Sequence, residues 1–435
     1  MKKIIPLILA VLLSGVLSAQ TNKDTGNQTK QSKKTANTTS NASWAKNVPA
    51  EDVVKWFRHI HQNPELSFKE DKTGKYVEEI LKSFPGIEVM RPAKTSVIGV
   101  LKGAKPGKTV AFRADMDALP MEEDTGLPYS SKVEGVAHTC GHDAHTAMLL
   151  GTASTLSKMR DQVNGTVYFV FQHAEETPPG GAIDIVESGA LKGVEAFFGM
   201  HVIPNYPVGH VGILPEGDAT TAQDIFNLTI IGEGSHGSSP HLSIDPIVVG
   251  SAIVGALQTI VSRNVPPGDL TVVSVGLFQA GNSANVIPPE AKLAATVRTT
   301  SEDTRKMVET RVKEIVEHIT KAYGATYKLD YIHAYPAVTN NAALNSLSKN
   351  SAIAILGKDQ VFDAPLTTAS EDFSYFEKIA PVSYMILGIG EGAANHNPEF
   401  KVDESALANG VKAQVQIILD YLNNKTKNTT MSDGQ

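Results

Sequence analysis

The chain contains a single cysteine, Cys140, among its 435 residues. One cysteine cannot form an internal disulfide, so this thiol is expected to be either buried or bound to a metal. The chain also has no excess of positive charge, because its formal net charge is -7. No stretch combines clustered lysines and arginines with aromatic residues. Nucleic acids and anionic membrane surfaces are therefore not expected as partners.

Long hydrophobic runs are missing too, apart from one near the N-terminus. Two lysines precede an apolar run over residues 4–13, and small residues follow up to Ala19. This pattern predicts a signal peptide over residues 1–19, and the run is too short for a comfortable membrane span. No cysteine stands directly after the run, which argues against a lipid anchor. We expect an exported bacterial protein, periplasmic or secreted, without stable membrane insertion after cleavage; an uncleaved tether is the alternative.

What the chain does contain is typical of a soluble globular protein. Hydrophobic residues make up 41% and charged residues 20%, and the length suits two or three domains. Residues 20–43 are polar and predict a disordered linker, and residues 426–435 predict a flexible tail. Between them, helical patterns at 51–62 and 68–83 follow the start of the globular part at residue 44.

Short apolar runs alternate with helical patterns in two parts of the globular chain, residues 44–217 and 333–425. The predicted strands are 97–101, 109–112, 166–171, 196–200 and 384–387, and the predicted helices are 142–158, 182–188, 342–356 and 404–423. Continuous apolar runs are typical of strands that are buried on both faces of a parallel sheet. The alternation therefore predicts an α/β catalytic domain with a mostly parallel sheet.

The segment between these two parts, residues 218–332, has a different order of elements. Its strands are predicted at 226–231, 271–278, 292–299 and 326–332, and its helices at 244–261 and 304–323. The order βαββαβ indicates a small α+β domain inserted between two halves of the catalytic domain. This inserted segment contains few candidate metal ligands.

Four predicted strands are each followed by residues that can bind a metal or transfer a proton. Asp115 and Asp117 follow strand 109–112, Glu175 and Glu176 follow 166–171, His201 follows 196–200, and His396 follows 384–387 through a glycine-rich loop. In open parallel sheets, ligands bind outside the carboxyl ends of the strands. We therefore expect these side chains to converge on one rim of the sheet.

Cys140 and His142 stand two residues apart, just before the predicted helix 142–158, so a tight turn can aim both side chains at one point. Thiolate and imidazole are good ligands for zinc-like metals. The alternative is a buried cysteine beside surface histidines. With the strand-end residues, the candidate ligands are Cys140, His142, Glu175 or Glu176, His201 and His396. Five ligands exceed the needs of one catalytic zinc ion and suit two ions that share a bridging ligand.

The adjacent acids Glu175 and Glu176 can take two different roles, one as a metal ligand and the other as a proton acceptor. Neighbouring side chains that leave a strand point in different directions, so one can bind metal while the other takes a proton from the attacking water and passes it to the leaving nitrogen. The alternative is a solvated acidic pair. Asp117 can orient an imidazole ligand by accepting its second N–H, or it can cap a helix or turn.

The inserted segment adds three polar candidates. His236, in a loop of glycines and serines, and Asn285 can stabilise the oxyanion of a tetrahedral intermediate. Arg298 ends a predicted strand and can hold a substrate carboxylate. Taken singly, each of these residue types is more often a surface polar residue.

Five sequence blocks stand out along the chain: 113–120 (RADMDALP), 138–143 (HTCGHD), 172–176 (QHAEE), 199–202 (GMHV) and 371–373 (EDF). They resemble the signature blocks of the M20 metallopeptidase family. The match is to its amidohydrolase branch, which includes hippurate hydrolases, N-acyl-amino-acid amidohydrolases and the plant auxin-conjugate hydrolases. The blocks are long, they occur in the family's order, and the resemblance covers nearly all of the globular chain.

The resemblance implies a two-metal site in an α/β catalytic domain with an inserted lid or dimerisation domain. Its metal ligands would be Cys140 as the bridge, with His142, Glu176, His201 and His396. Glu175 would be the general base and Asp117 the partner of a ligand. The two divalent ions would be zinc or manganese, with cobalt or nickel as alternatives.

The resemblance also assigns substrate contacts to His236, Asn285 and Arg298. In dimeric relatives the residue at the position of His236 acts across the subunit interface, whereas other members of the branch are monomers. A homodimer through the lid and a monomer therefore both stay open. The chain departs from the family pattern at His173, which replaces the usual proline. We expect His173 to lie on the surface, and a contact with the site is the alternative.

The leading hypothesis is a two-metal amidohydrolase that hydrolyses N-acyl amino acids to a carboxylic acid and an amino acid. One alternative is a metallo-carboxypeptidase or dipeptidase on short peptides, because the scissile bond is chemically the same. Another is a catalytically silent periplasmic binder of amino-acid conjugates. Such a binder is expected to have lost ligands or the base, and this chain has lost neither.

Overall fold

The computed structural model describes residues 42–423. The predicted signal peptide (1–19) and C-terminal tail (426–435) lie outside the described residues, as does nearly all of the predicted linker (20–43). At the end of that linker, Ser43 already begins the short 3-10 helix Ser43–Asn47.

Within residues 42–423, ten strands form the central sheet. Their order is β1 (Ile87–Met90), β2 (Val97–Lys102), β4 (Asn164–Gln172), β3 (Lys105–Asp115), β5 (Ala196–Ile203), β16 (Val382–Gly388), β14 (Thr339–Asn340) and β7 (Gly217–Asp218), with β6 (Val211–Ile213) beside β16 and β15 (Val361–Asp363) beside β6. The run from β4 to β14 is parallel. Strands β1, β2 and β7 pair antiparallel, and β6 pairs antiparallel with β16 and parallel with β15. The predicted mostly parallel sheet is confirmed. Short strands near its edges, such as β7 and β14, were not predicted, because they carry no strong sequence pattern.

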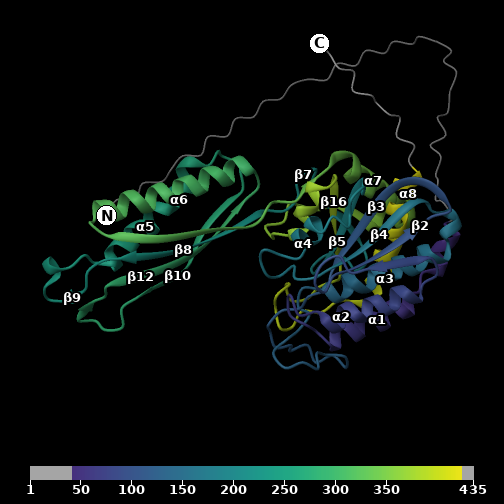
Figure 1. Ribbon diagram of the computed structural model, residues 1–435, viewed down its shortest axis with the longest axis horizontal. Helices are drawn as coiled ribbons and strands as arrows, with labels where there is room; N and C mark the ends of the chain where they lie inside the picture. The colour runs from purple at the N-terminus through teal and green to yellow at the C-terminus, as the bar shows by residue number, and fades with distance from the viewer. Residues whose placement is uncertain (1–41, 424–435) are drawn as a thin grey trace, which may run out of the picture. The chain divides into compact units, whose positions relative to one another are not determined.

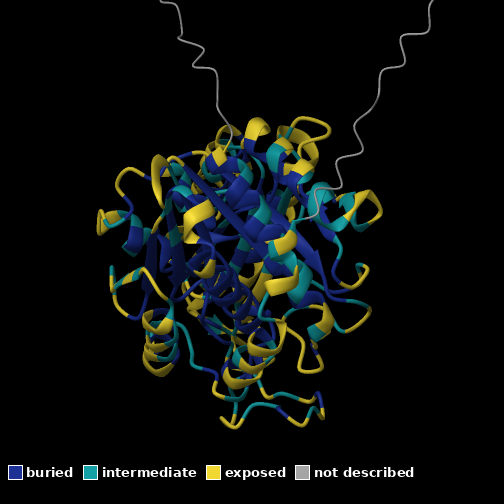
Figure 2. Cartoon of the chain, turned by 90° about the vertical axis from the view of Figure 1, so that its right-hand side faces the viewer, coloured by how far each residue is buried: buried dark blue, intermediate teal, exposed yellow. Residues whose placement is uncertain are grey.

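Helices cover both faces of this sheet. One face packs against α1 (Ala50–Gln62), α2 (Asp71–Ser83), α3 (His142–Lys158), α7 (Ala342–Leu356) and α8 (Leu407–Asn423), and the other against α4 (Ala182–Glu187) and the 3-10 helix Asp372–Lys378. Neighbours in one strand point to opposite faces, so Phe198 packs in the first core and Phe197 in the second. In Figure 2 the middle of the molecule is buried, whereas most exposed residues lie on outer helix surfaces and in loops.

The parallel order brings the predicted site residues to one edge. Strands β4, β3, β5 and β16 are successive neighbours, and their register places Asp115 opposite Gln172 and His201 opposite Ile386. Because these strands share a direction, their carboxyl ends lie side by side. The expected convergence on one rim is therefore confirmed for these strands.

The inserted segment forms a second sheet with the order β10 (Thr271–Ala280), β12 (Glu290–Thr299), β8 (Ala222–Ile231) and β13 (Thr326–Tyr335). Helices α5 (Pro246–Thr259) and α6 (Glu302–Ala322) lie along this sheet (Figure 1). A short ribbon, β9 (Ser235–His236) with β11 (Val286–Ile287), extends from it. Strand β13 continues to Tyr335, beyond the predicted end of the segment at residue 332.

Helix α5 combines a clear start signal with an apolar body. Asp245 caps it by accepting from the backbone N–H groups of Ile247 and Val248, and Pro246 occupies its first turn. Together with the π-helical turn Ile260–Asn264 it forms a stretch with a mean hydropathy of 1.4. Among the described residues this stretch meets the length and composition of a membrane span, but the same features suit a helix packed on a sheet.

Candidate active site

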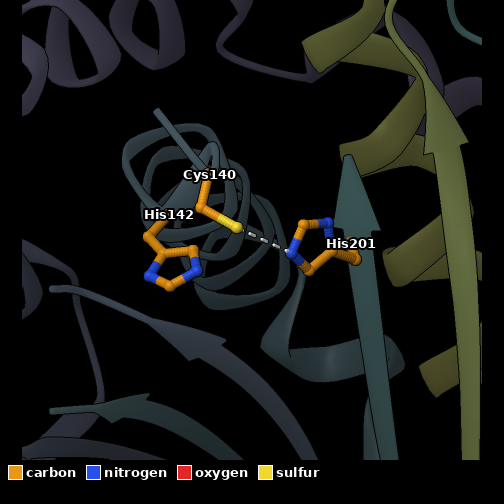
Figure 3. Close-up of side chains that lie close together, drawn as sticks. All are labelled: Cys140, His142 and His201. Atoms are coloured by element: carbon orange, nitrogen blue, oxygen red, sulfur yellow. Dashed lines mark hydrogen bonds between the residues drawn. The ribbon is translucent and has the colours of Figure 1, made fainter. Parts of the chain in front are cut away.

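The turn that carries Cys140 and His142 depends on Gly141. This glycine has a φ of 93°, and a Cβ at its position would lie 2.2 Å from a methyl group of Val202. A glycine is therefore required where the chain turns into α3. The turn brings Cys140 Sγ to 3.5 Å from Nε2 of His201 (Figure 3).

Two groups of potential ligand atoms share Cys140. The first consists of Cys140, His142 and His201, and the second of Cys140, Glu176 and His396; within each group the atoms lie within 4.8 Å of one another. A third group joins His142 to Glu175 and Glu176. All five predicted ligands thus come together, and the thiol stands where the first two groups meet.

Buried His142 and half-buried His201 present their Nε2 atoms to this cluster. Nδ1 of His142 lies 3.1 Å from a carboxylate oxygen of Asp117, and Nδ1 of His201 donates to the carbonyl of Val202 at 2.8 Å. Nε2 of His142 is buried and has no hydrogen-bond partner. A buried polar atom without a partner is costly, and a cation would satisfy it. The donor set therefore fits divalent metal ions.

The electrostatics of the cluster favour added positive charge. Burial, together with the nearby carboxylates of Glu176 and Glu175, raises the pKa of the Cys140 thiol well above its ordinary value. Burial alone would lower the pKa of His142, but Asp115 and Asp117 outweigh it and raise that pKa to about 10. The same negative charges that disfavour a thiolate in the metal-free chain attract cations. A bound cation would lower the pKa of the Cys140 thiol and so favour the thiolate.

Glu175 lies beside the ligands in a crowded acidic environment. Burial and the carboxylates of Glu371 and Glu176 raise its pKa well above the ordinary value for glutamate. Arg113 partly balances this charge, because its guanidinium contacts Asp115, Glu371 and Asp372 at 2.6–3.0 Å. A carboxylate with a raised pKa is a stronger proton acceptor, as a general base requires.

Three other histidines, in or next to the sequence blocks, have different surroundings. His145 is buried with Nδ1 2.6 Å from Asp115 and Nε2 accepting from the backbone of Val202, so neither nitrogen is free. His138 is also buried and belongs to none of the ligand groups found in residues 42–423. The surface position expected for His173 is wrong: it is fully buried, because Ser96, just before β2, and Asp184, on α4, lie against its two ring nitrogens.

A cavity of about 890 Å³ opens onto the ligand cluster. Arg298 lines it, together with Glu175 and apolar side chains such as Tyr206 and Leu366. His236 and Asn285 do not line it; both are exposed, on or beside the β9–β11 ribbon. Within one chain, the structure therefore brings one of the three predicted substrate contacts to the cavity.

Several residues of the site were not predicted from the sequence as functional. Arg113 and Asp372 lie within the family-like blocks, but no role was assigned to them. A charged residue inside an otherwise apolar strand is the signal that could have pointed to Arg113. Tyr335 and Tyr384, which also line the cavity, have no such signal because they come from ordinary strand positions.

Comparisons with known proteins agree with this geometry. The profile of peptidase family M20/M25/M40 matches residues 111–420. The chain is 47% identical over 289 residues to an N-acyl-L-amino acid amidohydrolase of Geobacillus stearothermophilus, covering 66% of this chain and 78% of the relative. It is 38% identical over 381 residues to thermostable carboxypeptidase 1 of Saccharolobus solfataricus, covering 85% and 95% of the two chains.

A solved structure extends the comparison to the fold. A Bacillus subtilis protein described as a dinuclear metal binding peptidase of the M20 family superposes with a TM-score of 0.75 at 35% identity, covering 87% of this chain and 99% of that one. The cluster around Cys140 is thus found in a chain whose sequence and fold both match this family. The chain belongs to peptidase family M20/M25/M40 and is a hydrolase of amide or peptide bonds.

Proposed function

We propose that this chain is a two-metal amidohydrolase that cleaves the amide bond of N-acyl amino acids. The observation that carries the proposal is that two ligand groups share Cys140, and that Cys140 lines the same cavity as Glu175 and Arg298. Cys140, His142, Glu176, His201 and His396 would hold the ions. Bound divalent ions would supply Lewis-acid polarisation of the carbonyl and a more acidic water, and zinc or manganese suits this thiolate, imidazole and carboxylate set.

The chain's own residues supply proton transfer and orientation. Glu175, with its raised pKa, accepts the proton of the attacking water and returns it to the leaving nitrogen. Asp117 holds His142 in one ring orientation. Arg298 reads the free carboxylate of the amino acid, and the apolar cavity wall, which includes Tyr206, Leu214 and Leu366, accepts an apolar acyl group.

A metallo-carboxypeptidase is the second candidate, favoured by the thermostable carboxypeptidase relative. In both the amidohydrolase and the carboxypeptidase reaction, Arg298 would bind the free carboxylate of the substrate. The two substrates differ in the group on the carbonyl side of the scissile bond, which is an acyl group in one and a peptide in the other. A silent binder is disfavoured because every predicted ligand is present in the cluster. Turnover of hippurate, acetylated amino acids and dipeptides by metal-reconstituted protein separates the three; binding without turnover would support the silent binder.

Replacing Arg298 with Ala should raise KM for an N-acyl amino acid by roughly 10- to 100-fold with a smaller change in kcat, because a charge-assisted contact to the carboxylate is lost in ground and transition states alike. Steady-state kinetics on the free acid and its methyl ester measure this. The ester should respond little. Arg311→Ala on α6, where Arg311 pairs with Glu314, is the control. An equal effect on acid and ester would remove Arg298 from the carboxylate-binding role.

We also propose a homodimer formed through the inserted segment. Large apolar side chains are exposed there, including Ile247 and Val248 on α5 and Leu277 and Phe278 on β10. Strand β10 is an edge of its sheet, and unpaired edges and apolar patches are typical of association surfaces. His236 is absent from the cavity of its own chain, and a second copy would supply it.

Co-expression of two inactive chains, His236→Ala and Glu175→Gln, should restore activity to roughly a quarter of the wild-type level, because half of the dimers are mixed and each has one complete site. Light scattering on the wild-type protein gives the oligomeric state. Each variant expressed alone is the control. A monomer in solution, or no recovery on co-expression, would contradict a contribution of His236 from the partner.

For the N-terminal segment we propose export followed by cleavage after Ala19. Support comes from the two lysines and the apolar run over residues 4–13. The intact mass of the protein recovered from the periplasm or medium tests the cleavage. A full-length mass in a membrane fraction would favour the uncleaved tether.

A further inference from the structure

The loop that carries Glu175 is held by side chains from outside it. Four successive residues each make a backbone hydrogen bond to a side chain of another segment: the N–H of His173 to Ser96 Oγ at 3.1 Å, the N–H of Ala174 to Glu70 Oε1 at 2.9 Å, the carbonyl of Glu175 to the hydroxyl of Tyr335 at 2.7 Å, and the N–H of Glu176 to Asp117 Oδ2 at 3.0 Å. Ala174 has a φ of 52°, a costly conformation that persists because its surroundings impose it.

Three of these four anchors come from segments next to the central sheet, and the fourth does not. Ser96 directly precedes β2, Glu70 precedes α2, and Asp117 follows β3. Tyr335 is the last residue of β13, a strand that belongs to the sheet of the inserted segment. Its hydroxyl therefore ties the end of that second sheet to the backbone of the proposed base.

The backbone near Tyr335 is irregular. The pairing of β13 with β8 shifts register between His333 and Tyr335, which leaves Ala334 as an extra residue. Such bulges re-aim the side chains that follow them. Tyr335 is only 3% exposed, lines the active-site cavity, and spans 160 residues of sequence to reach Glu175. The carbonyl of Ala334 is satisfied separately, by the hydroxyl of Tyr375 at 2.7 Å.

We propose that Tyr335 is a positioning residue for Glu175. By donating to the Glu175 carbonyl, its hydroxyl sets the direction in which the Glu175 side chain enters the cavity. That direction therefore depends on the position of the end of β13. The proposal rests on the proposed function, in which Glu175 transfers the proton. Small displacements of a catalytic group lower the rate of the chemical step much more than they weaken substrate binding.

Tyr335→Phe tests this with a matched control. The substitution keeps the ring and removes only the hydroxyl, and we expect kcat to fall on the order of tenfold while KM stays within about twofold. Metal content should stay at the wild-type level, because the substitution leaves all five proposed ligands in place. Tyr375→Phe removes a hydroxyl–carbonyl bond one residue away on the same strand end, and it should leave kcat near the wild-type value.

Two outcomes would overturn the proposal. Equal losses of kcat in Tyr335→Phe and Tyr375→Phe would show that a loosened strand end, rather than the Glu175 carbonyl, causes the effect. The second outcome concerns the double variant. If Tyr335→Phe lowers kcat as much in the Glu175→Gln background as in the wild-type background, Tyr335 does not act through the carboxylate of Glu175. Failure of the proposed function is distinguishable, because Glu175→Gln would then be active by itself.

Discussion

Replacing Glu175 with Gln should lower kcat by about 10²–10⁴-fold while the protein keeps its bound metal, because an amide of nearly the same shape cannot accept the proton of water. Glu175 is 7% exposed, and its pKa is raised by burial and by Glu371 and Glu176, so its basicity depends on these surroundings. Single-turnover kinetics with metal analysis of the same sample measure both quantities.

The control for this result is Glu377→Gln. Glu377 is another glutamate whose burial raises its pKa, to about 7, and it accepts from the backbone of Thr339 outside the active-site cavity. Its amide variant should keep near-normal turnover. Near-full activity of Glu175→Gln would remove Glu175 from the role of base, and loss of metal from that variant would assign it to the ligands instead.

Replacing Cys140 with Ala should remove metal and activity together. The thiol belongs to both ligand groups, so its loss weakens two sites at once, and we expect metal affinity to fall by more than about 100-fold. A ligand that binds only the folded state raises the melting temperature. Added zinc or manganese should therefore stabilise the chelator-treated wild-type protein against heat and stabilise the Cys140→Ala variant much less.

His145→Ala is the informative comparison for Cys140→Ala. Both ring nitrogens of His145 are already engaged, by Asp115 and by the backbone of Val202, so this variant should keep most of its metal. It should melt at a lower temperature because Asp115 loses a buried partner. Full binding of two ions by Cys140→Ala, or complete loss of metal by His145→Ala, would contradict the assignment of the shared ligand.

Local patterns were sufficient for much of the fold and of the metal cluster. Helices α3 and α7 begin and end at the predicted residues, because apolar periodicity and nearby turn residues define a helix within its own segment. Residues that follow parallel strands share one rim whatever the order of those strands. His201 and His396 could therefore be grouped with Cys140 before their contacts were known.

Other features depend on contacts between distant segments. Burial of His173 follows from the packing of β4 against α4 and the residues before β2. The absence of His236 and Asn285 from the cavity follows from the course of the β9–β11 ribbon. No local pattern encodes either, because a side chain's surroundings are set by elements far away in the sequence.

The sequence by itself determined the family, the parallel α/β architecture and the identity of the clustered ligands, because these depend on residue type, spacing and strand direction. Only the tertiary structure decided how closely the ligand atoms gather around Cys140, within 4.8 Å of one another in each of its two groups, and that Arg298 lines the cavity whereas His236 does not. It also decided that Tyr335 reaches the backbone of Glu175. Cys140 meets His201 and His396 across 61 and 256 residues of chain. Long-range packing, rather than local preference, sets the geometry of such contacts.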